Sequence, residues 1–526
     1  MAIAHRVVQL EPKNSPVVSL PSPTTPGNER TTDWGSLVAD LSRREEPTFH
    51  VHDRTHVEFA IDYRLTAGSS REQYEWQAFF FAPESLRLDS RTYDKNDIYS
   101  DLQSYVRFEV PEVEFGALGD DAMDDVKRAL ADGSAEHAMN ELRLYACRVR
   151  AAGVNVRRQI FDALSKNTPE HAFDLALGLA RNARRVSAEL RQTLQGVGER
   201  GDPLATAACW VQEDVSRLLE ALLAHVGQRL ERAQAPRRVV QEVEDAALAE
   251  ARHRSSQGLG GIGRLGMKRR DIETIEFRRH MLKRFTASVL WLSPEVRPAS
   301  RWVRELLFAV AASVAMGFAI GAGILNGFQA EPRRWMDWML IAVVAYAAKD
   351  RIKASLQHVF SSVLDRHFPD RRWRIRDRER GVTLGTMKEQ SGFIGWDTVP
   401  EAVLASRRIT REHPLEEQAR PETVLFHQKQ VTLFADRVVK ADPRLSALTE
   451  IFRLNLGPWL AHTDDPKRDI VFADPVAGRV GSAQAPRVYN IAVVYRLRRV
   501  GDDDAPWHRL RVVVTRKGIR RIENIT

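Results

Sequence analysis

The feature that most constrains this chain is a run of 25 residues, 306–330, that contains no charged residue. A helix over residues 306–328 would be about 35 Å long at about 1.5 Å per residue. That length crosses a hydrocarbon core of about 30 Å. The alternative is a helix buried inside a soluble domain, but such a helix does not require so long an uncharged run. The sequence therefore predicts a transmembrane helix.

A second apolar run, residues 335–348, follows closely. It would span only about 21 Å by the same rise per residue, and it contains Asp337. Asp337 lies near the start of the run, where a carboxylate reaches the headgroups, and Trp335 and Trp338 suit a membrane interface. We therefore expect a short second span and a transmembrane hairpin over residues 304–348.

The positive charge of the chain is concentrated on both sides of this hairpin. The whole chain has a formal net charge of +8, whereas residues 264–284 and 349–380 each carry +5 when their Lys, Arg, Asp and Glu are counted. Basic residues beside a membrane span are typical of contact with anionic lipids rather than nucleic acid. The predicted lipid-binding residues are Lys268, Arg269, Arg270, Lys283, Arg284, Lys349, Arg351 and Lys353.

The same charges predict the topology. Basic residues precede the first span and follow the second, and the positive-inside rule places such ends in the cytoplasm. The first residues lack the apolar stretch of a secretory signal peptide. We expect a multi-pass protein of the inner (cell) membrane with both termini cytoplasmic.

The soluble regions combine strand and helix patterns. Apolar residues alternate over residues 48–65, and a second apolar strand follows at 74–81, which together predict an antiparallel hairpin. Residues 120–256 have helical periodicity, with Pro169 and Pro203 at expected helix starts. After residue 370 the pattern predicts an antiparallel sheet, including two final strands joined by an acidic turn, and a helix over residues 445–456.

The predicted fold class is an α+β multidomain membrane protein. The expected division is a disordered tail (1–47), a cytosolic β-hairpin plus helical domain (48–257), a Gly-rich hinge and basic juxtamembrane segment (258–303), the transmembrane hairpin (304–348), a juxtamembrane helix (349–369) and a cytosolic α+β domain (370–526).

Small residues in the first predicted span form two rows on nearly opposite helix faces. One row is Ala309, Ser313, Gly317 and Gly321, and the other is Ala311, Ala315, Ala319, Gly323 and Gly327. Small residues let helix backbones approach closely in lipid. One face is expected to hold the second span and the other a second protomer, although a helix this rich in Ala and Gly also shows such rows by chance.

Four segments resemble a family of uncharacterised bacterial membrane proteins with two spans. They are FFFAPESL (79–86), YDKNDIYSDLQSYVRF (93–108), KDRIK (349–353) and GIRRIE (518–523). These segments are not catalytic signatures. The resemblance implies the two-span architecture and no activity or site.

The best candidate for site chemistry is FHVHDRTH (49–56). His50, His52 and His56 have the same strand parity, and imidazoles two residues apart on a strand can share a metal ion. The alternative is a polar strand face that happens to contain several histidines. The segment GLGGIGRLG (258–266) has glycine spacing seen in dinucleotide sites, but no strand precedes it, so a hinge is favoured. We assign no catalytic residue and expect no cofactor.

These observations favour a non-enzymatic sensor, adaptor or scaffold held at the inner membrane. Its expected partners are anionic lipids and another protein or further copies of itself, and not nucleic acid. Two alternatives remain. One is a membrane-tethered metal-dependent hydrolase that uses the three histidines, and the other is a membrane-perturbing oligomeric effector.

Overall fold

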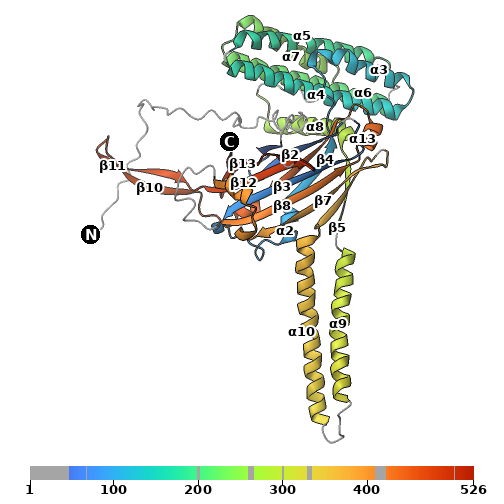
Figure 1. Ribbon diagram of the computed structural model, residues 1–526. Helices are drawn as coiled ribbons and strands as arrows, with labels where there is room; N and C mark the ends of the chain where they lie inside the picture. Colours follow the sequence, from blue (N-terminus) through green and yellow to red (C-terminus); the bar gives the residue numbers. More distant parts are fainter. Residues whose placement is uncertain are drawn as a thin grey trace.

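The computed structural model describes residues 47–66, 68–166, 168–197, 202–258, 263, 266–298, 301–327, 335–378, 380–408, 422–502 and 504–525. They form a β domain, a helical bundle and a pair of long helices (Figure 1). The predicted tail, residues 1–47, lies outside the described residues except for Pro47.

The β domain contains a large antiparallel sheet. Its strands are β3 (Glu72–Pro83), β5 (Ser293–Pro298), β6 (Arg371–Arg376), β7 (Thr383–Ile394), β8 (Glu422–Leu433), β12 (Tyr489–Arg499), β13 (His508–Thr515) and β14 (Gly518–Asn524). Their order is β14-β13-β12-β3-β8-β7-β6-β5. The predicted pairing of the two last long strands is confirmed, since β12 and β13 run antiparallel.

A smaller sheet packs against the large one. Its strands are β1 (Thr48–Val51), β2 (His56–Arg64), β4 (Leu102–Phe108) and β9 (Ala447–Asn455), in the order β1-β2-β9-β4. The shared core lies between the sheets, where Phe59 on β2 contacts Trp76 on β3 at 5.4 Å between ring centroids. A separate two-stranded sheet contains β10 (Lys467–Asp474) and β11 (Arg479–Pro486).

The predicted N-terminal hairpin is wrong in its pairing. β2 pairs with β1 and β9, whereas β3 pairs with β12 and β8 in the other sheet. β3 is buried on both faces, with Phe80 in the main core and Phe79 and Phe81 in a second cluster. Alternation indicates which face of a strand is apolar, but it carries no information about which strand lies beside it.

The predicted helix over residues 445–456 is also wrong, because this segment forms the central strand β9. Leu448 and Phe452, which suggested a helical stripe, lie in the core between the sheets. Residues four apart share a face in a helix, and they share a face in a strand as well. The spacing was therefore compatible with both structures.

These pairings join the two ends of the chain into one β domain. Strands from residues 48–108 lie beside strands from residues 422–515 in the large sheet and in the smaller one. The bundle and the two long helices are thus insertions into the β domain (Figure 1). This differs from the expected separation into an N-terminal and a C-terminal domain.

The bundle confirms the predicted helical region. Its helices are α3 (Asp121–Ala131), α4 (Ala135–Ser165), α5 (Pro169–Thr193), α6 (Pro203–Arg232) and α7 (Arg237–Ser256), and α8 (Arg269–Ala287) lies between the bundle and the β domain (Figure 1). Pro169 and Pro203 begin α5 and α6, and Asp202 caps α6 by accepting from the backbone N–H of Leu204.

Short helices connect the strands. They are α2 (Lys95–Asp101), α11 (Glu401–Arg408), α13 (Ala435–Ala441), α14 (Gly457–Leu460) and the 3-10 turns Glu84–Leu86, Phe115–Gly119, Ser288–Leu290 and Trp396–Thr398.

Two long helices, α9 (Arg301–Gly327) and α10 (Trp335–His367), lie side by side and project away from the β domain (Figure 1). Ala311 and Ala315 are buried on α9, which packs on α10. Among the described residues, α9 is the one helix that is long and apolar enough to cross a membrane, with a mean hydropathy of 1.9 over Glu305–Ala322.

Candidate functional site: a charged cavity between the bundle and the β domain

A cavity of about 1360 Å³ lies between the helical bundle, α8 and the β domain. α3 and α4 form one wall, α8 and residues 288–293 form another, and β4, β9 and the segments 377–380 and 441–445 complete it. Small-molecule sites typically have volumes of about 300–1,000 Å³. The space therefore accommodates a sizeable ligand.

The cavity is connected to the long helices by one pair of strands. Ser293 lines the cavity at the start of β5, and β5 leads to α9. β6 starts after α10 and ends next to Asp377, which also lines the cavity. β5 and β6 pair from Ser293↔Arg376 to Pro298↔Arg371, a ribbon about 20 Å long at about 3.3 Å per residue.

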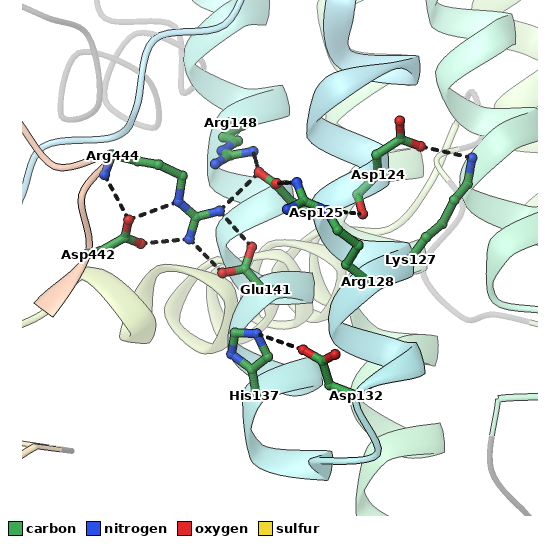
Figure 2. A network of polar contacts seen from close by, with 10 residues as sticks. All are labelled: Asp124, Asp125, Lys127, Arg128, Asp132, His137, Glu141, Arg148, Asp442 and Arg444. Atoms are coloured by element: carbon green, nitrogen blue, oxygen red, sulfur yellow. Dashed lines mark hydrogen bonds and ion pairs between the residues drawn. The ribbon is translucent and has the colours of Figure 1, made fainter.

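Arg444 joins the β domain to the bundle at the acidic wall of this cavity (Figure 2). Its guanidinium donates to Glu141 on α4 at 2.6 Å, to Asp125 on α3 at 3.0 Å and to Asp442 at 2.6 Å. Arg148 on α4 donates to the other side of the network, at 2.8 Å from Oδ2 of Asp125. One arginine from the β domain thus binds carboxylates of two bundle helices.

The network favours the ionised forms of Asp125 and Asp442. Burial alone would raise the pKa of Asp125, but the hydrogen bond from Arg148 and the charges of Arg148 and Arg444 outweigh it and lower that pKa. Burial likewise opposes ionisation of Asp442, whose pKa is lowered by the Arg444 hydrogen bonds. The hydrogen bond to Asp442 in turn raises the pKa of Arg444.

The other acidic groups of the cavity also have cationic neighbours. Their closest contacts are Glu276 with Arg279 at 2.7 Å, Asp377 with Arg380 at 2.9 Å and Asp132 with His137 at 3.9 Å. Each of the six carboxylates in the lining therefore has a basic side chain within ion-pair distance.

Basic side chains exceed acidic ones in the lining, where eight Arg and Lys face six Asp and Glu. Arg284 on α8 and Arg378 after β6 are exposed, and neither contacts a carboxylate in the described part of the chain. Arg279 is half-buried, and burial lowers its pKa. The cavity therefore has a net attraction for anions.

An aromatic pair lies at the same cavity. Tyr105 on β4 and Trp291 meet edge to face at 5.8 Å between centroids, and they are 36% and 39% exposed. The guanidinium of Arg453 lies 5.5 Å from the Tyr105 centroid. Partly exposed aromatic rings beside cations suit a planar group that carries negative charge.

The predicted lipid-binding residues fall into two separate groups. Lys268, Arg269 and Arg270 lie at the start of α8, and Lys283 and Arg284 near its end line the cavity. α8 lies at the opposite end of the β domain from α9 and α10 (Figure 1). The basic residues of α8 therefore do not lie beside the long helices, where they were expected.

The second group lies on α10. Lys349, Arg351 and Lys353 follow its apolar part, and the Lys349 ammonium lies 3.8 Å from the ring centroid of Tyr346. Only this group of the predicted lipid-binding residues is on the long helices.

The three predicted metal ligands do not converge. His50 and His52 both face Glu58, at 2.9 and 3.4 Å, whereas His56 faces Asp53 at 2.9 Å. β1 ends before His52 and β2 begins at His56, so the three are not on one strand. Within the described ranges, no group of three or more His, Cys, Asp and Glu is placed to hold a metal ion.

The small-residue rows of α9 have different surroundings. Ser313 and Gly317 are exposed, Gly321 is half-buried, and no atom lies within 4 Å of a Cβ added at either glycine. The opposite row contains Ala311 and Ala315, which are buried. For Gly323 and Gly327 of that row, the surroundings lie outside what the structure describes.

A second ionic cluster, which no sequence pattern indicated, is enclosed between the large sheet and the smaller one. Lys429 on β8 contacts Glu450 on β9, and its ammonium lies 3.4 Å from Glu389 on β7. Tyr63 donates to Glu450 at 2.7 Å, and Ser104 lies 2.9 Å from the ammonium. We call these five residues the Lys429 cluster.

The Lys429 cluster is suited to structure rather than catalysis. Burial opposes the charge of Lys429, but Glu450 and Glu389 outweigh it and raise the pKa of the ammonium. Nearby, Ser391 and His427 are 2.6 Å apart and almost fully buried, and burial lowers the pKa of His427 well below its usual value. None of these residues lines the cavity, so a substrate has no access to them there.

Arg444 is the site residue that no sequence pattern indicated, whereas Arg284 was predicted to bind lipid and Arg378 lies in the basic stretch 349–380. The three arginines come from distant segments of the chain, and no motif groups them into one site. Comparisons of the chain with protein-family models, with curated proteins and with solved structures gave no match.

Proposed function

We propose that this protein is a membrane-anchored, non-enzymatic sensor in which α9 and α10 cross the inner membrane and the cavity binds an anionic ligand. The observation that carries the proposal is the position of the cavity. Its walls come from the bundle and the β domain, and the paired strands β5 and β6 lead from it to the two long helices. A ligand in the cavity would therefore contact the bundle, α8 and the β domain, and it would lie beside the ends of the strands that lead to the long helices.

The lining defines the chemistry of the ligand. The excess of Arg and Lys favours phosphate or carboxylate groups, and Arg284 and Arg378 are available to bind them from two different segments of the lining. Tyr105 and Trp291 add a surface for a planar ring. The best fit is a small phosphorylated molecule with an aromatic base.

Ligand binding in the cavity would affect the two long helices through β5 and β6. A ligand held by both Arg284 and Arg378 would fix the end of α8 relative to the end of β6. α8 continues through residues 288–293 into β5, so the same ligand would bias the ribbon that leads to α9 and α10. A ligand shifts a conformational equilibrium when it binds one conformation of the protein more tightly than the other.

Calorimetry on the full-length protein in detergent tests the ligand. Inorganic triphosphate supplies charge alone, adenosine supplies a ring alone, and ATP supplies both. We expect triphosphate to bind and ATP to bind more tightly. The double variant Arg284→Gln/Arg378→Gln should bind triphosphate and ATP about tenfold or more weakly, since a hydrogen bond to a charged group contributes about 1.5–3 kcal/mol.

Arg269→Gln is the matched control, because Arg269 is on the same helix, is 94% exposed and does not line the cavity. It should bind triphosphate as the unchanged protein does. Absence of binding by all three probes, or equal losses in the control and the double variant, would contradict the proposed ligand site.

Reporter fusions test the membrane part of the proposal. Fusions after residue 300 and at the C-terminus should both report a cytoplasmic location, because basic residues at 297, 301, 304, 349, 351 and 353 flank the hairpin. A fusion in the connecting segment near residue 331 should report the periplasm. A periplasmic signal from either outer fusion would contradict the hairpin.

A further inference from the structure

The two-stranded sheet of β10 and β11 stands apart from the rest of the β domain (Figure 1). The strands pair along their whole length, from Lys467↔Pro486 to Asp474↔Arg479. In the middle of β10, Ile470, Val471 and Phe472 are 47%, 70% and 46% exposed. An isolated two-stranded sheet has marginal stability in water, and three consecutive exposed apolar residues add an unfavourable contact with solvent. We call β10 and β11 the arm.

The arm has an open edge on β10. Within the part of the chain that the structure describes, β10 has β11 as its strand neighbour on one side and none on the other. Such an edge pairs readily with another strand unless charge, Pro or a bulge blocks it. Residues 470–472 contain no charge and no Pro, and the β10–β11 register is unbroken. The other edge, on β11, is less suitable because it consists mainly of small residues and ends in Pro486.

The sequence of β10 is complementary to itself in an antiparallel arrangement. It begins with Lys467, Arg468 and Asp469, has apolar residues in the middle and ends with Asp474. With a two-fold axis at Val471, Ile470 faces Phe472 of the second copy and Arg468 faces its Asp474. Opposite charges and large apolar residues thus meet across the interface, as cross-strand pairs prefer. A parallel arrangement would instead place like charges beside each other.

The direction of the arm is compatible with this pairing. The arm extends sideways from the β domain, crosswise to α9 and α10 (Figure 1). Two copies in one membrane are related most simply by a two-fold axis along the membrane normal. Such an axis reverses any strand that lies across it, so the two β10 strands would meet antiparallel. This step rests on the membrane anchoring proposed above.

We propose that β10 is a dimerisation edge, through which two copies of this chain form a continuous four-stranded sheet with the order β11-β10-β10-β11. The apolar residues 470–472 of each copy then cover those of the other. Dimerisation also extends the proposed sensor function, because one two-fold axis would relate the two membrane hairpins and the two cavities of the dimer.

Cysteine cross-linking of the full-length protein in membranes tests the register. The background is Cys209→Ser, because Cys209 is exposed and Cys147 is buried. Val471→Cys should give a covalent dimer on oxidation, since directly opposed residues are about 4.5–5.5 Å apart. Lys467→Cys should not, because its two copies would be eight residues apart along the strands, about 27 Å at about 3.4 Å per residue.

A charge on the edge tests the interface in a second way. Val471→Lys should weaken self-association about tenfold or more, because the two-fold axis would place two ammonium groups together in the interface. Val480→Lys is the matched control, since Val480 is 72% exposed on β11, away from the pairing edge. Both substitutions replace an exposed residue of the same arm, and the dimer fraction is measured by light scattering of the solubilised protein.

The outcomes separate clearly. A dimer that Val471→Lys dissociates and Val480→Lys leaves intact supports the proposal. A monomeric wild-type protein, equal effects of the two substitutions or equal cross-linking at positions 467 and 471 overturns it. Ligand binding and reporter location are measured independently, so failure of the dimer is distinguishable from failure of the proposed function.

Discussion

Lys429→Met is expected to lower the free energy of unfolding by about 3–5 kcal/mol, the usual cost of removing one partner from a buried ion pair. Lys429 and Glu450 are fully buried, and Glu389 is 2% exposed. Without the ammonium, the two buried carboxylates lose the cation that contacts both of them. Denaturant unfolding of the full-length protein in detergent measures the loss.

A second substitution tests the cause. Glu450→Gln combined with Lys429→Met removes one of the two buried carboxylates and should recover a large part of the lost stability, because the repulsion between two buried negative charges is then absent. Burial raises the pKa of Glu389. The control is Lys388→Met on the exposed face of β7, with an expected change within about 0.5 kcal/mol. If the double variant is less stable than Lys429→Met, charge imbalance is not the cause.

Glu58→Gln is expected to cost about 3 kcal/mol at neutral pH. The Glu58 side chain is fully buried and accepts a hydrogen bond from Nε of Arg453 at 2.6 Å. Burial alone would raise its pKa, but the contacts with His50 and Arg453 outweigh it and lower the pKa of Glu58 to about 2. A shift from 4.5 to about 2 corresponds to about 3 kcal/mol at about 1.4 kcal/mol per unit.

The sign of the pH dependence follows from the lowered pKa. The folded protein holds the Glu58 proton less tightly than the unfolded chain, so the contribution is fully present above about pH 4.5. It is lost as the pH falls from 4.5 towards 2. Unfolding free energies measured across this range should decrease more steeply for the wild type than for Glu58→Gln. Parallel profiles would contradict the assignment.

Glu84→Gln is the matched control, because Glu84 is an exposed glutamate of the same domain. Its unfolding free energy should stay within about 0.5 kcal/mol of the wild type at every pH.

Much of the local structure was predictable because its causes are local. The uncharged run at residues 306–330 produces α9, and no distant contact is needed to explain it. Pro169 and Pro203 begin helices because a proline lacks the N–H that the first helical turn leaves unbonded in any case. The alternation at residues 48–65 correctly indicated strands, since the β1 and β2 side chains do face a core on one side.

The candidate site was much less predictable. The three histidines share strand parity in the sequence, but the chain turns between His52 and His56, and Glu58 on the returning strand attracts two of them. Lys283 and Arg284 follow the pattern of lipid-binding residues, yet α8 packs between the bundle and the β domain and directs them to the cavity. The same positive charge suits an anionic lipid or an anionic ligand, and only the position of the helix distinguishes them.

By itself, the sequence determined the apolar helix α9, the helices of the bundle and the presence of most strands, because composition, periodicity and proline positions act over a few residues. The tertiary structure alone decided that β2 lies beside β9, that β3 lies between β12 and β8, and that Arg444 meets Glu141 and Asp125. These contacts join residues about 300 to 400 positions apart, and their free energy depends on shape and burial in the assembled core. The periodicity within a segment therefore does not determine which distant segment it contacts.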